Sequence, residues 1–229
     1  MNVEMHGVQL VDRVIEQVTR HGWDTIDAPT LTSPVPVAPE VIGRLRIGGK
    51  PLPPSLQRWL AFDGSWLAEL GWFENAEHPL LDGEMLGAVT TQMYGFTEQD
   101  DAWVEMFASF EVLLPERCFP LVGGSDSRRL LYAGKPDSTG EYPVLVTDID
   151  DLPYVAVMYP GFDGYLADLA GVINLEFDEY TSLTDHPEYG SRMREHANYT
   201  GLGPEGKEIQ DLDWPDAEAC SEDAGSQLL

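Results

Sequence analysis

The sequence predicts an α+β domain in which helices pack against an antiparallel-rich sheet. Three observations support this fold class. Apolar residues follow helical spacing in the first 65 residues, short apolar runs punctuated by glycine follow, and one more helical pattern closes the sequence near residue 165. Helices, then a meander of strands, then a helix is the element order of an α+β fold whose strands pair mainly antiparallel.

Three helices are predicted before the strands. In the first, apolar residues recur with helical spacing until the chain reaches His21-Gly22. That stripe comprises Leu10, Val11, Val14, Ile15 and Val18. After a stiff proline-rich connection at 31–40, Pro39-Glu40 begins a second helix that continues through VIGRLRI and ends at Gly48-Gly49. The third helix, in PLPPSLQRWLAFDGSW, places Leu56, Trp59 and Leu60 on one face and ends at Asp63-Gly64.

The rest of the predicted domain consists of six short strands and two helices. The strands correspond to the runs LAELGWF, MLGAVTTQMY, CFPLVG, RLLYAG, YPVLVTDI and PYVAVMY. A helix is inserted between the second and third strands at EQDDAWVEMFASFEVLL, where acids in the first turn favour a helix start. A last helix follows at GFDGYLADLAGVI.

Length and charge predict one domain with an acidic tail. We expect a single α+β domain over residues 1–202, whose N-terminal helix lies before the main fold, and a partly disordered tail over residues 203–229. The 229 residues carry a formal charge of −27 with a pI near 4.2, which argues against direct binding of nucleic acid or anionic membranes. Because no signal peptide or apolar membrane segment is visible, we expect a cytoplasmic protein.

Cofactors and metals are not expected. Cys118 and Cys220 have neither a disulfide framework nor metal-ligand spacing, and Cys118 is predicted to be an ordinary buried thiol. Residues 123–127, GGSDS, lack the lysine and spacing of a phosphate loop and predict a tight turn between strands. None of the five histidines has a local partner typical of a catalytic triad, so we expect them on the surface. They are His6, His21, His78, His186 and His196.

Three passages resemble a known family. Residues 52–64, LPPSLQRWLAFDG, have a Leu-Pro start, a helix and a closing Asp-Gly. Residues 119–132, FPLVGGSDSRRLLY, read as strand, glycine-rich turn and strand, and residues 143–172 read as strand, acidic turn, strand and helix. In this order they resemble the SUKH superfamily, the Smi/Knr-like immunity proteins, over about residues 38–173.

The resemblance implies a non-catalytic protein that binds and neutralises a bacterial toxin, commonly a nuclease or deaminase. A toxin that handles nucleic acid needs a basic cleft, and an acidic partner is steered toward such a cleft by its charge. The expected partner is therefore a basic protein toxin whose active site this chain occludes, and no catalytic residue, metal or cofactor is expected here.

Two acidic sets are the candidate contacts with that partner. The first follows a predicted strand and comprises Asp148, Asp150 and Asp151. The second precedes a predicted helix and comprises Glu98, Asp100 and Asp101. The first set also fits a solvated turn or a weak cation site, and the second fits helix capping. Aromatic residues at Trp59, Phe62, Trp66, Trp72 and Phe73 predict core packing, with an interface anchor as the other interpretation of the excess at 66–73.

Two other functions fit the same sequence. A scaffold or regulatory module of this fold would bind a cellular protein in place of a toxin. A hydrolase acting through paired carboxylates and a divalent cation would gain stability from Ca²⁺ or Mg²⁺.

Overall fold

A four-stranded antiparallel sheet forms the centre of the described structure. This computed structural model describes residues 5–22, 33–47, 49–65, 118–121, 127–148, 155–175 and 186–196. The sheet contains β3 (Cys118–Leu121), β4 (Ser127–Tyr132), β5 (Val144–Asp148) and β6 (Val155–Tyr159), and each strand pairs with the next along the chain. The prediction of an α+β fold with an antiparallel sheet is confirmed for these residues.

Not every predicted element lies within the described residues. The last four predicted strands correspond to β3 through β6. The two earlier strand predictions, the helix inserted at residues 98–114, the turn at 123–127 and the tail from residue 203 lie outside the described residues. The backbone of Cys118 is in β3, while its side chain lies outside the description.

The first helix, α1 (Val8–His21), forms where the apolar stripe predicts it. Leu10, Val11, Val14 and Val18 are buried, and the helix ends at Gly22, whose φ of 76° is favourable for glycine. The buried side of α1 packs against α3 (Pro54–Leu60) and α7 (Phe162–Leu169). The N-terminal helix is therefore an integral part of the described core.

The second predicted helix is wrong in its C-terminal half. Helix α2 spans only Pro39–Ile42, and a small antiparallel hairpin of β1 (Arg46–Ile47) and β2 (Lys50–Pro51) follows it. Gly49, in the pair predicted to end the helix, has a φ of 76° and lies in the connection of this hairpin. The buried residue Ile47 belongs to this hairpin.

The last part of the described chain contains a helix that the sequence analysis missed. Helix α7 ends at Leu169, earlier than predicted, and Gly171 after it has a φ of 64°. Helix α8 spans Gly190–His196 and contacts β6. The sequence of α8, GSRMREH, contains Met193 as its one aliphatic side chain, too few for a helical apolar stripe.

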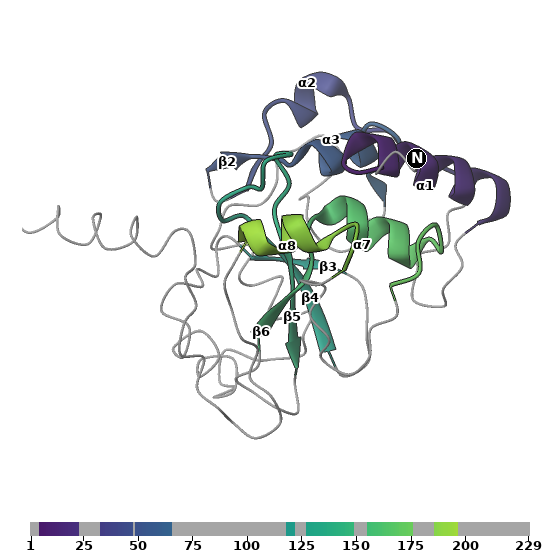
Figure 1. The fold of residues 1–229 in the computed structure, drawn as a ribbon. Coiled ribbons are helices and arrows are strands. Elements are labelled where there is room, and N and C mark those ends of the chain that lie inside the picture. The colour runs from purple at the N-terminus through teal and green to yellow at the C-terminus, as the bar shows by residue number, and fades with distance from the viewer. Residues whose placement is uncertain are drawn as a thin grey trace, which may run out of the picture.

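The helices gather toward one end of the sheet, and α7 and α8 lie next to the strands (Figure 1). A single core cluster contains buried side chains from the helices and the sheet, among them Leu10, Trp59, Leu130, Phe162 and Met193. Within the described residues, no helix is long and apolar enough to cross a membrane.

Candidate functional site

The predicted contact residues fall mostly beyond the described part of the chain. Asp148 is the last residue of β5 and its backbone is paired with Ser127 of β4. Asp150 and Asp151 lie in the connection to β6, outside the described residues, as do Glu98, Asp100 and Asp101. Of the six predicted contacts, the structure therefore places only the Asp148 backbone, and the joint acidic surface stays a prediction.

Charge is distributed very unevenly between the described residues and the rest of the chain. The described residues contain 11 acidic and 11 basic side chains and are formally neutral. The full formal charge of −27 is thus carried by the other residues, which include five of the six predicted contacts. The described framework is balanced in charge, and four of its acids, Asp63, Asp137, Glu141 and Asp163, are buried.

A buried polar cluster surrounds Arg192 of α8. The Arg192 Nε donates to Asp137 Oδ2 at 2.7 Å, and its Nη1 and Nη2 donate to the two carboxylate oxygens of Asp163 at 2.8 and 3.1 Å. The Arg192 side chain is 7% exposed and both carboxylates are fully buried. A guanidinium that donates two hydrogen bonds to one carboxylate is held in a fixed orientation. Arg192 therefore joins α8 to α7 and to the loop between β4 and β5.

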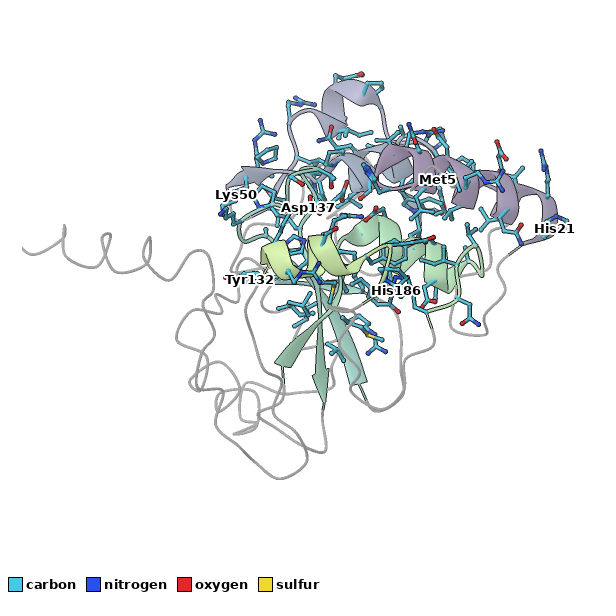
Figure 2. All side chains as sticks on the ribbon, in the orientation of Figure 1. Met5, His21, Lys50, Tyr132, Asp137 and His186 are labelled. Atoms are coloured by element: carbon cyan, nitrogen blue, oxygen red, sulfur yellow. The ribbon has the colours of Figure 1, made fainter. Side chains whose placement is uncertain are left out.

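The loop between β4 and β5 is organised by Asp137, which lies on the side of the sheet where the helices gather (Figure 2). Its Oδ1 accepts hydrogen bonds from the Thr139 amide and hydroxyl at 2.8 and 2.6 Å and from the Glu141 amide at 3.0 Å. Burial acts to raise the pKa of Asp137, but the nearby His196 ring, the charge of Arg192 and a hydrogen bond from Thr139 outweigh it and hold that pKa well below its usual range. Asp137 is consequently ionised at neutral pH.

Glu141 is a second buried carboxyl group in this loop and caps the start of α3. Its side-chain oxygens accept hydrogen bonds from the Ser55 amide at 2.8 Å and the Ser55 hydroxyl at 2.5 Å. Burial, and next the charge of Asp163, raise the pKa of Glu141 to about 8 against the opposing effects of Ser55 and Arg192. Glu141 is therefore mostly protonated at neutral pH. We call Asp137, Glu141, Asp163 and Arg192 the Arg192 cluster.

The chain N-terminal to α1 also reaches the Arg192 cluster. The Gly7 amide donates to Asp163 Oδ2 at 2.6 Å, and Gly7 has a φ of 58° that glycine adopts without strain. Asp163 thus accepts hydrogen bonds from α8 and from the residue before α1. Four segments that are distant in the sequence, around residues 7, 55, 137–141 and 192, meet at the start of α7.

His196 contradicts the prediction that the histidines lie on the surface. It is buried, its Nε2 donates to the carbonyl oxygen of Pro160 at 2.6 Å, and the same atom lies 3.7 Å from Asp137 Oδ2. Its Nδ1 is buried without a hydrogen-bond partner. His6 and His21 are exposed and His186 is half-buried, while His78 lies outside the described residues. Because α8 was not predicted, nothing in the sequence analysis indicated that His196 would face the core.

A small pocket of about 180 Å³ opens beside the Arg192 cluster. Met5 and His6 form one side and Ser138 and Thr139 another. Residues 188 and 189 and residues of α8, including Arg192, form the rest. Glu195 of α8 is fixed at this pocket because it accepts hydrogen bonds from the Ser138 amide at 2.6 Å and the Ser138 hydroxyl at 3.0 Å. The pocket therefore lies where the N-terminal residues, the β4–β5 loop and α8 meet.

The chemistry of the Arg192 cluster is that of a structural junction. Each of its carboxyl groups accepts hydrogen bonds from the chain itself, and its groups are buried. Buried charges arranged in this way join segments that would otherwise separate. Among the described residues, no group of three histidine, cysteine or acidic side chains is arranged to hold a metal ion.

Comparisons with known proteins leave the family open. No family model matches the chain, and no curated protein matches it. The chain is similar to a solved structure described as the "crystal structure of uncharacterized protein from Salmonella enterica subsp. enterica serovar typhimurium str. 14028s". The identity is 15%, the TM-score is 0.48, and the match covers 80% of this chain and 87% of that chain. A likeness of this degree assigns no function.

Proposed function

We propose that this chain is a non-catalytic, cytoplasmic immunity protein that binds a basic protein toxin and occludes its active site. The observation that carries the proposal is the order of three sequence passages that resemble the SUKH superfamily, at residues 52–64, 119–132 and 143–172. These passages include α3, the four strands of the sheet and α7, and their buried residues contribute to one core cluster. A shared core is what a single binding domain requires.

The distribution of charge supports a partner that is basic. Because the described framework is neutral, the charge of −27 belongs to segments outside it, including the connections that hold Asp150 and Asp151 and Glu98, Asp100 and Asp101. Acidic groups concentrated on such segments attract a basic cleft and speed association, an effect that salt screens. We infer that these carboxylates, together with Asp148, contact the toxin.

Coexpression with the product of the neighbouring gene tests this function. If that product is the toxin, expression of this chain restores growth and the two proteins copurify. Failure to restore growth, together with no complex in a pull-down, would contradict the proposal. Recovery of a housekeeping protein in place of a toxin would support a scaffold or regulatory module.

Charge-neutralising variants test the predicted contacts. A variant with Asp148, Asp150 and Asp151 changed to asparagine is expected to bind the toxin at least tenfold more weakly at low salt. The matched control changes three exposed acids of the neutral framework, Glu16, Glu40 and Glu188, to glutamine and removes the same charge. Equal losses in the two variants would mean that net charge alone, and not this connection, drives binding.

A further inference from the structure

We propose that residues Met5–Gly7 form a strap over the buried carboxyl groups of Glu141 and Asp163, and that this strap opens when Glu141 loses its proton. The inference concerns a conformational change within the chain, and it is independent of the proposed toxin binding.

The strap lies directly against the two carboxyl groups. The Gly7 amide donates to Asp163 Oδ2 at 2.6 Å, and a Cβ atom built on Gly7 would lie 4.0 Å from Glu141 Oε1. Gly7 is buried, whereas Met5 and His6 before it are exposed and line the pocket beside the cluster. The strap thus separates a buried pair of acids from a solvent-accessible pocket.

The charges that face Glu141 make its ionisation disruptive. Ser55 of α3 contributes an uncharged hydroxyl, and the loop that holds Glu141 itself contributes the ionised Asp137. Helix α7 contributes Asp163, while α8 contributes Arg192 and, beside Asp137, His196. On the strap itself, His6 is exposed. When Glu141 is ionised, three buried carboxylates share one guanidinium, and the added charge is stable only if water reaches it.

Opening the strap is the smallest movement that admits water. Helices α3 and α7 are anchored by fully buried side chains such as Leu56, Trp59 and Phe162. The strap has no comparable apolar anchor, because Met5 is 39% exposed and Gly7 has no side chain. Since burial and Asp163 raise the pKa of Glu141 to about 8, the protonated, closed form predominates at neutral pH and opening becomes easier as the pH approaches 8.

Hydrogen exchange of the Gly7 amide, measured by NMR between pH 5 and 9 and corrected for intrinsic rates, tests this proposal. Because the closed state holds a proton that the open state releases, the opening constant is expected to rise up to about tenfold per pH unit from pH 5 to 8 and then to level off. It should exceed the opening constants of the Leu130 and Leu131 amides in β4 at least 100-fold, because these report unfolding of the whole domain.

Two variants and one control make the test specific. Glu141→Gln mimics the protonated group and is expected to abolish the pH dependence at Gly7. Should that variant not fold, Ser55→Ala removes a hydrogen bond that favours the ionised group, so the levelling-off is expected at higher pH. The control Glu188→Gln, at an exposed acid of the pocket, should behave as the natural chain.

Three results would overturn the proposal. One is a Gly7 opening constant that does not change between pH 5 and 8. Another is the same pH dependence in Glu141→Gln as in the natural chain. The third is an opening constant at Gly7 equal to that of β4, which would mean that the strap opens only when the whole domain unfolds.

Discussion

Replacing Arg192 by methionine tests whether the Arg192 cluster holds the domain together. The substitution retains much of the apolar stem and removes three hydrogen bonds of 2.7, 2.8 and 3.1 Å to Asp137 and Asp163. Both carboxylates stay buried and lose their counter-charge. Breaking a buried pair by removing one partner costs about 3–5 kcal/mol, so we expect the free energy of unfolding to fall by about that amount at pH 7.

A surface ion pair of the same chain is the matched control. The Arg58 Nε donates to Asp12 Oδ1 at 2.7 Å, the same distance as between Arg192 and Asp137, but these side chains are 34% and 49% exposed. Solvent screens such pairs, so Arg58→Met is expected to cost about 1 kcal/mol or less. The two arginines differ in burial and in the number of hydrogen bonds they donate, so the comparison contrasts a buried, multiply bonded arginine with an exposed single ion pair.

Urea unfolding followed by tryptophan fluorescence and circular dichroism measures both variants. If Arg192→Met does not fold, Arg192→Lys is measured in its place. It keeps the charge but cannot donate the two parallel hydrogen bonds to Asp163, so we expect a smaller fall in the free energy of unfolding than for Arg192→Met. A loss for Arg192→Met of about 1 kcal/mol or less, or one equal to that of Arg58→Met, would refute the view that the cluster is an essential junction.

Four further measurements test other parts of the structure. Glu141 has a raised pKa, so its contribution to the free energy of unfolding is complete below about pH 4.5 and is lost as the pH rises toward 8. Asp137 has a lowered pKa, so its contribution is complete at neutral pH and is lost progressively as the pH falls below about 4. Urea titrations from pH 3 to 9 should therefore show maximal stability near pH 4–5. Maximal stability above pH 8 would contradict the assignment for Glu141, and maximal stability at pH 3 would contradict that for Asp137. Leu10→Ala on the buried side of α1 should lower the free energy of unfolding by about 2–5 kcal/mol. Val8→Ala, at a position that is 40% exposed, should lower it by at most about 0.5 kcal/mol. Similar losses for the two variants would mean that α1 is not part of the core. Gly161→Ala would bring a Cβ to 2.5 Å from Asp163 Oδ1 and 2.8 Å from Arg192 Nη2, so we expect the free energy of unfolding to fall by about 1–3 kcal/mol. Gly43→Ala, where the nearest atom would lie at 3.4 Å, should cost almost nothing. Deleting residues 204–229 should weaken toxin binding and its salt dependence if the tail contacts the partner, and unchanged binding would assign the tail to solubility.

Elements with local apolar patterns were predictable from the sequence. The stripe from Leu10 to Val18 predicted α1 because a helix repeats every 3.6 residues, and the runs around Leu130 and Leu145 predicted strands of the sheet. Their antiparallel order followed from the short connections between them. Trp59 was correctly predicted as a core residue and is fully buried.

The Arg192 cluster was not predictable in the same way because its members meet only in the folded chain. Arg192 is separated by 55 residues from Asp137 and by 29 from Asp163, so no local spacing links them. A partial signal exists in Asp137-Ser-Thr-Gly, a pattern typical of a turn in which the aspartate accepts hydrogen bonds from the residues that follow. That pattern predicts the turn but not that Arg192 pairs with the Asp137 carboxylate.

The shortest elements were missed for a related reason. Helix α8 has too few apolar residues for a periodic pattern, and its position depends on buried Arg192, Met193 and His196. The β1–β2 hairpin is two residues long on each side, and a glycine such as Gly49 is equally typical of a turn and of a helix end. For α8 and for this hairpin, the local sequence fits more than one backbone conformation, and contacts with the rest of the fold select one of them.

The most direct test of the central claim is the affinity of the purified chain for the neighbouring gene's product, measured by titration calorimetry at 50 and 500 mM salt. We predict a stoichiometric complex that binds at least tenfold more tightly at low salt, because acidic side chains outside the neutral framework meet a basic toxin. Absence of any complex at 50 mM salt would contradict the proposed function.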